Sequence, residues 1–353
     1  MKKRLGFRTK KLLSLMMVGC LLFALAACGK DDTQGDSGLT AVTTPGAEQS
    51  IGNSVTTGTT SQTENGWDEA AILAEGYYNT EYNEYFVGGI SFTLDAATKT
   101  AKASSLYIAD TTEYYMPDEI AYEGVVYQVN AMENGVFADS DATKVRLSSN
   151  LTVIPESLFQ GSEALTEIVI PEKVTEIGNN AFTLCSALSK ITLPANLKKI
   201  GSEAFFGCSA LAELTIPEGV TEIGESAFYE CSLLREIVFP ASLKKVPDEA
   251  LNNCVCLETV VIPQGVSQIG LEVFWGCTAL KKVELPDSVV LMGTRAFYDC
   301  ASLEEVILPA NLLEVDAEMF AFCESLTTVN ASAAVAELIH EEMPAAEFEI
   351  VIR

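Results

Sequence analysis

Cysteine recurs at a fixed interval through much of this chain. Seven cysteines stand 23 residues apart: Cys185, Cys208, Cys231, Cys254, Cys277, Cys300 and Cys323. Prolines from Pro171 to Pro309 and leucines from Leu165 to Leu326 follow the same period. Such a period indicates a repeat architecture in which each unit contacts only its neighbours. We therefore expect one stack of turns, not the two or three globular domains that 353 residues would otherwise suggest.

Each unit contains a short segment in which inward apolar and outward positions alternate, as in a β-strand. The segment ends at proline. The unit from Cys208 to Glu230 has the sequence CSALAELTIPEGVTEIGESAFYE. Proline has no N–H for a ladder, so the strand should stop there. About eight inward side chains per unit cannot offset the conformational entropy of 23 ordered residues. Stacking on neighbouring units in a continuous parallel ladder must therefore supply the remaining stability.

A glycine follows the second aliphatic segment in most units, before the Ala-Phe pair. These glycines are Gly178, Gly201, Gly224, Gly270 and Gly293. Glycine adopts positive φ without steric cost, so we expect a turn with φ > 0 at this position.

The repeat resembles that of the BspA-like leucine-rich-repeat family of bacterial surface proteins. The Ile-Pro, Ile-Gly, Ala-Phe and Cys landmarks carry this resemblance from about residue 120 to 335. It implies an α/β-type solenoid, a leucine-rich-repeat right-handed superhelix of about 8 to 9 rungs with a parallel β-sheet. It also implies a short strand-rich N-terminal cap and a link to adhesion to host matrix proteins and other cells.

Departures from the repeat are local, and the terminal rungs are expected to be atypical. Ser162 replaces the first cysteine, and Pro247 and Leu251 replace glycine and phenylalanine in one rung. Asp316 replaces glycine in the last rung. We expect a strand-rich N-terminal cap with a first partial repeat at 67–137, BspA-like repeats at 138–335 and a C-terminal cap at 336–353.

The first residues have the features of a targeting segment. Six cations precede a 16-residue apolar run from Leu12 to Ala27, which suits a signal peptide and is short for a membrane span. The run ends in Leu-Ala-Ala-Cys-Gly, which resembles the lipobox of bacterial lipoproteins and implies lipid attachment at Cys28 after removal of residues 1–27. An ordinary signal peptide is the alternative. Residues 28–66 are rich in Ser, Thr and Gly and are expected to form a disordered tether.

Charge excludes several function classes. The formal charge is −27, and removal of the leader leaves 16 basic against 49 acidic residues, or −33. A body this acidic repels a phosphate backbone, so no nucleic-acid partner is expected. With His340 as the one histidine and neither a phosphate loop nor a nucleophile motif, we expect no enzyme, no cofactor and no catalytic or metal site.

The seven periodic cysteines allow three interpretations. Equivalent residues on neighbouring rungs should lie about 4.8 Å apart, within the Cα range that a disulfide tolerates. Their side chains would run parallel and their number is odd, so buried free thiols are the preferred interpretation. Disulfides and a metal site are the alternatives, although a linear ladder cannot surround one ion tetrahedrally.

One residue per predicted strand should face solvent between the two inward positions. These residues form a mostly β-branched stripe: Val169, Thr192, Thr215, Val238, Val261, Glu284, Ile307 and Asn330. Strand propensity alone could account for them. The functional interpretation is a shallow binding face for a protein or glycan, flanked by charged residues.

A second outward position alternates in charge between neighbouring rungs. Glu176, Lys199, Glu222 and Lys245 should each lie beside opposite charges and help to set the register of the stack.

Two functions are consistent with these features. The preferred one is a lipoprotein on the bacterial cell surface, anchored in the membrane through Cys28, that binds a protein or glycan ligand on host matrix or another cell. The alternative is a non-adhesive structural or scaffolding protein of the cell envelope.

Overall fold

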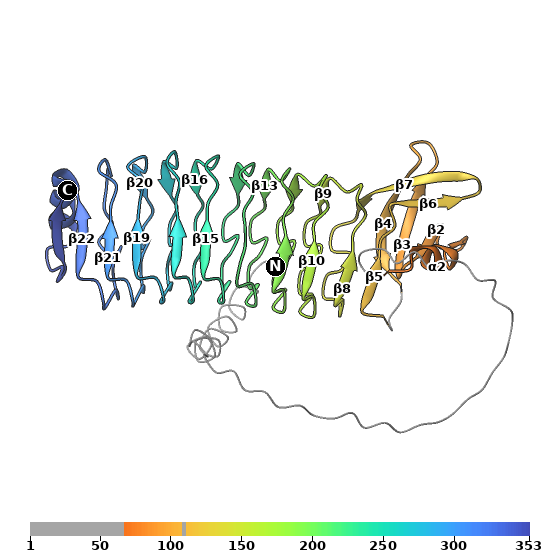
Figure 1. Ribbon diagram of the computed structural model, residues 1–353, viewed down its shortest axis with the longest axis horizontal. Helices are drawn as coiled ribbons and strands as arrows, with labels where there is room; N and C mark the ends of the chain where they lie inside the picture. Colours follow the sequence, from red (N-terminus) through yellow and green to blue (C-terminus); the bar gives the residue numbers. More distant parts are fainter. Residues whose placement is uncertain (1–66, 108–110) are drawn as a thin grey trace, which may run out of the picture. The chain divides into compact units, whose positions relative to one another are not determined.

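The computed structural model describes residues 67–107 and 111–353 (Figure 1). The expected signal peptide, the lipid site at Cys28 and the tether to Gly66 lie outside these residues. Within the described part of the chain, every helix is too short or too polar to cross a bilayer.

A mostly antiparallel sheet precedes the repeats. Its strands lie in the order β1-β2-β3-β4-β7-β6, and only the β4–β7 pair is parallel. The strands are β1 (Tyr77–Asn79), β2 (Glu84–Val87), β3 (Ile90–Asp95), β4 (Thr100–Leu106), β6 (Glu119–Tyr122) and β7 (Val125–Met132), and helix α2 spans Glu69–Ala74. Ile90, Phe92 and Val129 have no solvent exposure, so this sheet has its own apolar side.

Strand β5 (Glu113–Tyr115) connects this sheet to the first turn of the repeats. It pairs in parallel with β8 (Lys144–Arg146), and the Arg146 guanidinium lies 2.7 Å from the Asp118 carboxylate. The backbone N–H and hydroxyl of Ser149 also donate to Asp118. Burial opposes the charged form of Asp118, but these hydrogen bonds outweigh it and hold the pKa of that carboxyl below its usual range.

The repeats stack as predicted, with residues 23 apart paired in two parallel ladders (Figure 1). Three-residue strands make most of the first ladder: β10 (Glu167–Val169), β12 (Lys190–Thr192), β15 (Glu236–Val238), β17 (Thr259–Val261), β19 (Lys282–Glu284) and β21 (Glu305–Ile307), followed by β22 (Thr328–Ala331) and β23 (Glu349–Ile352). Two-residue strands make the second: β9 (Val153–Ile154), β11 (Glu176–Ile177), β13 (Lys199–Ile200), β14 (Glu222–Ile223), β16 (Lys245–Val246), β18 (Gln268–Ile269) and β20 (Leu291–Met292).

The predicted solenoid with a parallel sheet is therefore confirmed, but its turns contain little helix. Within the described residues, α2 precedes the repeats and α3 (Ala333–Glu342) follows them. Turns and the two-residue strands connect successive strands of the first ladder. The sequence pattern did not indicate this second ladder as β-structure.

Phenylalanine rings fill the interior of the stack. Phe182 and Phe205 lie with ring centroids 5.4 Å apart and planes 1° from parallel, and the stack runs from Phe137 to Phe228. Leu251 interrupts it, after which Phe274, Phe297 and Phe320 resume it. The phenylalanine of the Ala-Phe landmark is thus a core position in each of these turns except the one with Leu251.

The seven periodic cysteines are free thiols, as the preferred interpretation held, and six of them are fully buried. Each sulfur contacts the backbone carbonyl of the residue 26 positions earlier, as in Cys208 Sγ to Phe182 O at 3.2 Å. Where serine replaces cysteine, the Ser162 hydroxyl donates to Phe137 O at 2.6 Å. The position therefore supplies a second donor to a carbonyl that already accepts a backbone N–H, as Phe182 O does from Cys185. Burial raises the pKa of the Cys185 thiol to about 12, so it stays protonated and can donate.

The prediction of positive φ at the repeat glycines was wrong. The left-handed residues are instead found two positions later, as at Asn180, Glu203 and Ser226. Glycine is required because the backbone of the preceding turn comes too close. A Cβ on Gly224 would lie 2.3 Å from the Ser202 nitrogen, and one on Gly201 would lie 2.6 Å from that of Asn179.

Candidate functional site

The predicted stripe lies on the outside of the first ladder. Val169 is 67% exposed, and Val238 and Val261 are each 43% exposed. Ladder pairing aligns Val169 with Thr192, Val238 with Val261 and Glu284 with Ile307. Thr192, Thr215 and Glu284 are exposed, and Ile307 and Asn330 are half-buried.

Ion pairs between neighbouring turns border the stripe. Lys282 Nζ lies 2.6 Å from Glu305 Oε2, and Arg235 lies 2.9 Å from Glu258. The Lys190–Glu167 pair is looser, at 3.8 Å. These charged side chains thus pair with each other along the stack, beside the exposed valines.

The first ladder has incomplete strand pairing near its middle. Thr215 lies outside the strands of this ladder, and its turn is joined to β15 by the single bridge between Glu213 and Glu236. Within the described residues, β17 and β19 are not paired either, so pairing aligns the stripe in three segments: Val169 with Thr192, Val238 with Val261, and Glu284 with Ile307 and Asn330.

A second candidate site lies where the second ladder is interrupted, between β14 and β16. In the turns before it, the Thr221 N–H donates to Lys198 O at 2.9 Å and the Gly224 N–H donates to Ile200 O at 2.9 Å. In the turns after it, the Ser267 N–H donates to Lys244 O at 2.9 Å. Within the described residues, no backbone hydrogen bond joins 221–224 to 244–247.

Proline accounts for this interruption. Pro247 occupies the position at which Gly201, Gly224 and Gly270 each donate an N–H to the preceding turn. Proline has no N–H, so it cannot make that bond. The turns stay joined beyond the gap, where the Ser226 N–H donates to Asp248 O at 2.9 Å.

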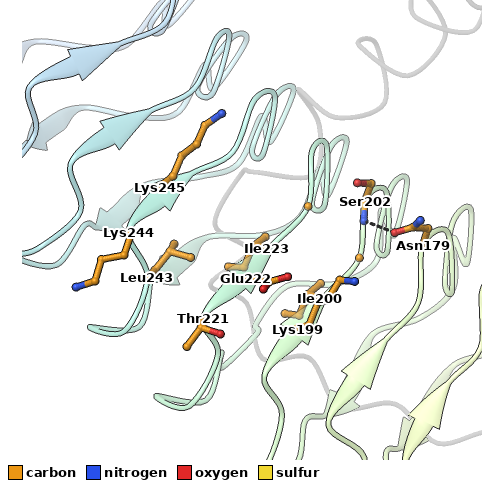
Figure 2. Close-up of a pocket in the computed structure, with 12 residues that line it drawn as sticks. Asn179, Lys199, Ile200, Ser202, Thr221, Glu222, Ile223, Leu243, Lys244 and Lys245 are labelled. Atoms are coloured by element: carbon orange, nitrogen blue, oxygen red, sulfur yellow. Dashed lines mark hydrogen bonds between the residues drawn. The ribbon is translucent and has the colours of Figure 1, made fainter.

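A pocket of about 420 Å³ spans the interruption (Figure 2). Polar side chains line it from both sides, and buried aliphatic residues form its floor. Its lining side chains are Asn179, Lys199, Ile200, Ser202, Thr221, Glu222, Ile223, Leu243, Lys244 and Lys245. Figure 2 shows Lys244 and Lys245 on one side of the gap and Glu222 on the other, with the Lys244 side chain directed away from Glu222. A Cβ on Gly265 would lie 3.5 Å from Lys244 Nζ, so this ammonium lies against the following turn. A neighbouring pocket of about 460 Å³ shares Asn179 and Lys199.

The predicted charge alternation holds in one place and fails in another. Lys199 Nζ lies 2.9 Å from Glu176, and the hydrogen bond and charge of this carboxylate raise the pKa of Lys199. Lys245 was expected beside Glu222, but its ammonium lies 3.1 Å from Asp248 in its own turn. The reason is the same interruption, which removes the pairing that would align Lys245 with Glu222.

The pocket was not predicted from the sequence. Its one signal was Pro247, a departure that the sequence shows clearly. Lysine, hydroxyl and carboxylate side chains suit polar binding. Across the described residues, no cluster of His, Cys, Asp and Glu side chains could hold a metal ion.

The comparisons with known proteins agree with this fold. The model of the BspA type leucine rich repeat region matches in six copies, over residues 130–258 and 244–342. No curated protein matches the chain. A solved leucine-rich repeat protein from Bacteroides ovatus is 29% identical, with a TM-score of 0.57 over 70% of this chain and 70% of that one.

Two further solved structures are more distant. A leucine rich repeat protein from T. pallidum is 26% identical over 54% of this chain and 88% of that one, with a TM-score of 0.49. A leucine rich cell surface protein from Faecalibacterium prausnitzii is 19% identical over 72% of this chain and 97% of that one, with a TM-score of 0.31. The family model matches more than half of this chain's residues, so the chain belongs to the BspA type leucine rich repeat family.

Proposed function

We propose that this protein is a lipoprotein of the bacterial cell surface that binds a protein or glycan partner through the stripe Val169–Ile307. One observation carries the proposal. Exposed apolar residues recur on the outside of the first ladder, aligned by 23-residue pairing, and include Val169, Val238 and Val261. A face held rigid by its own ladder loses little conformational freedom on binding.

Charge favours a basic partner surface for this stripe. The chain carries a formal charge of −27, and Glu167, Glu236 and Glu284 lie on the strands that bear the stripe. Complementary charge steers diffusional encounter and disfavours acidic partners. A host matrix protein or another cell surface with a cationic patch fits these requirements.

Attachment at Cys28 would place this face outside the cell. A body of charge −33 is repelled by anionic lipid, so it needs a covalent anchor to stay at the membrane. Residues 28–66 would supply a flexible spacer of about 35 Å root-mean-square length. Leucine-rich-repeat proteins are typically non-enzymatic, and we propose no catalytic activity.

A scaffolding role in the envelope is the second candidate, favoured by the long paired stack itself. The two roles differ in what the stripe does. A binding protein needs Val238 and Val261 exposed for a partner, whereas a scaffold needs only the stack.

The test replaces Val238 and Val261 together by lysine and measures capture of host matrix proteins and of bacterial envelope fractions. We expect the variant to keep its thermal stability, because both side chains are exposed, and to lose at least about tenfold in affinity for its partner. A matched control replaces Val153 and Leu313, two exposed apolar residues outside the stripe, by lysine and should keep full capture. Unchanged capture by the lysine variant would refute the stripe as the binding face.

A further inference from the structure

Half-buried aromatic rings form an interrupted row on the turns that follow the second ladder. Phe206 stacks on Tyr229 with ring centroids 4.8 Å apart, and Trp275 stacks on Tyr298 at 4.2 Å. Each of these residues directly follows the core phenylalanine of its turn. Asn252 takes this position between Tyr229 and Trp275, so the row of rings has a break there.

Acceptors without a donor lie at the break. Asn252 is 4% exposed, and its Oδ1 accepts no hydrogen bond within the described residues. Glu230 lies one turn earlier, with its backbone nitrogen 2.9 Å from Asn252 O. Burial raises the pKa of the Glu230 carboxyl, and this group has no ion pair or side-chain hydrogen bond anywhere in 67–107 or 111–353.

Two further carboxylates add to the negative charge. Glu249 and Glu272 hold equivalent positions in neighbouring turns, and burial and the charge of Glu249 raise the pKa of Glu272. Burial also raises the pKa of Tyr229, and the charges of all three glutamates raise it further. These carboxylates therefore lie close enough to act on one hydroxyl group beside the break. Among the described residues, Glu249 has no ion pair; it accepts a hydrogen bond from the Ser226 hydroxyl.

The chain's own Arg295 shows which group suits such a surface. It holds the position equivalent to Glu272 in the next turn, and its guanidinium lies 2.5 Å from Glu318 and 3.5 Å from Glu272. The same guanidinium lies 5.7 Å from the Trp275 ring centroid and 6.0 Å from that of Tyr298. A planar cation thus contacts the carboxylates and the aromatic rings of this surface together.

A guanidinium at the break fits the same geometry. Two turns separate the Tyr229 and Trp275 rings, about 10 Å at the usual strand spacing. A planar cation above Asn252 would then lie about 5 Å from each ring, within the range of about 6 Å for cation–π contact. A metal ion does not fit, since no group of His, Cys, Asp and Glu side chains in the described part of the chain could hold one. An organic cation is therefore the ligand that these acceptors and rings favour.

We propose that the break at Asn252 docks an arginine side chain from a basic segment of a partner protein. The guanidinium lies between the rings of Tyr229 and Trp275, with the carboxylates of Glu230 and Glu249 as its ion-pair partners. These residues belong to the turns after the second ladder, whereas the stripe lies on the first ladder. Docking at the break therefore does not require the stripe.

The test follows Trp275 fluorescence in the full chain carrying Trp67→Phe, which leaves one tryptophan. Acetylated and amidated tetra-arginine is the probe, with tetralysine and maltotetraose as comparison ligands. We expect tetra-arginine to change the emission with a Kd of about 0.1–1 mM. Tetralysine should bind at least about threefold more weakly, because an ammonium lacks the planar face that stacks on rings. Unchanged emission, or equal binding of tetralysine or maltotetraose, would overturn the proposal.

Variants separate this site from general attraction to an acidic protein. Glu249→Gln should weaken tetra-arginine binding about fivefold, whereas the matched control Glu236→Gln removes the same charge from the first ladder and should not change it. Equal weakening by both would show attraction to net charge alone and refute the site. Asn252→Tyr fills the break with a ring and should weaken binding at least about tenfold; Glu249→Gln decides the test if this variant does not fold. The Val238→Lys/Val261→Lys variant should bind tetra-arginine normally, and loss of binding there would place the probe on the stripe instead.

Discussion

Two turns of the solenoid differ at two landmarks, the glycine and the phenylalanine. The turn ending in Gly201-x-x-Ala204-Phe205 has the glycine that accommodates the preceding backbone and a ring stacked on both neighbours. The turn with Pro247 lacks the ladder bond, and Leu251 interrupts the ring stack. Its Asn252 is buried, and the side-chain oxygen has no hydrogen-bond partner within the described residues.

The irregular turn nevertheless keeps its place in the stack. Cys254 contacts Phe228 O at 3.2 Å as every other periodic cysteine contacts its carbonyl, and the Phe228 N–H donates to Ala250 O. Core and thiol contacts therefore hold the turns together where the second ladder is interrupted. Local departures can then open a site on the surface without unfolding the repeat.

The largest expected change in unfolding free energy comes from truncating the core residue at the phenylalanine position of each turn. Phe205→Ala removes a fully buried ring between two stacked rings and should cost about 3–5 kcal/mol of unfolding free energy. Leu251→Ala should cost less, about 2–4 kcal/mol, since the stack is already interrupted there. Chemical denaturation measures both. Phe322→Ala is the control, because that ring is 62% exposed and should change stability by less than about 0.5 kcal/mol.

The glycine position should respond unequally in the two turns. Gly224→Ala places a Cβ 2.3 Å from the Ser202 nitrogen and should destabilise by about 1–3 kcal/mol. Pro247→Gly should change the free energy of unfolding by less than about 1 kcal/mol, because the restored hydrogen bond offsets the entropy that glycine adds to the unfolded chain. Thermal unfolding of both variants checks this. A loss of more than about 2 kcal/mol in Pro247→Gly would contradict the proposed cause of the interruption.

The thiol ladder should tolerate serine better than alanine. Cys208→Ala removes one of the two donors to Phe182 O and leaves a small cavity. Because the Cys185 N–H still donates to this carbonyl, the change should cost about 1–2 kcal/mol. Cys208→Ser keeps a donor, as Ser162 does, and should cost less. Denaturant midpoints of the two variants give the difference, and the opposite order would show that sulfur packing matters more than donation.

The smallest effect concerns surface charge. Lys199→Glu breaks the pair with Glu176 in the intact ladder and should lower stability by at most about 1 kcal/mol at low salt, and by less at high salt. Lys245→Glu breaks only a pair within its own turn and should have a smaller effect. A salt series of unfolding midpoints tests this, and salt-independent values would leave no register role for Lys199.

Much of the fold follows from the 23-residue period alone. The period predicted the stack, the inward phenylalanines and the buried thiols, because each depends on a side chain and its equivalent one turn away. The roles of Gly201 and Gly224 were misjudged, since the constraint is the approach of a neighbouring backbone and not the φ of the glycine itself. The distance between each glycine and the backbone of the preceding turn depends on how closely the turns stack.

The candidate sites were predictable to different degrees. Val169 and Val261 were placed on the outside by strand alternation, which is a local property. The pocket depends on which acceptor the missing Pro247 N–H would have met on the preceding turn, and Lys245 was misplaced for the same reason. The sequence shows that proline removes a backbone N–H, but it does not show which acceptor on the preceding turn loses its hydrogen bond.

Hydrogen exchange of single backbone amides tests most directly whether the second ladder is interrupted at Pro247. The Lys198, Thr221 and Ser267 amides donate to the preceding turn and should exchange slowly, whereas the Lys244 amide should exchange at least about tenfold faster. Pro247→Gly should slow the Lys244 amide to the rate of its neighbours. Equal protection of all four amides in the unaltered protein would contradict the interruption and the pocket built on it.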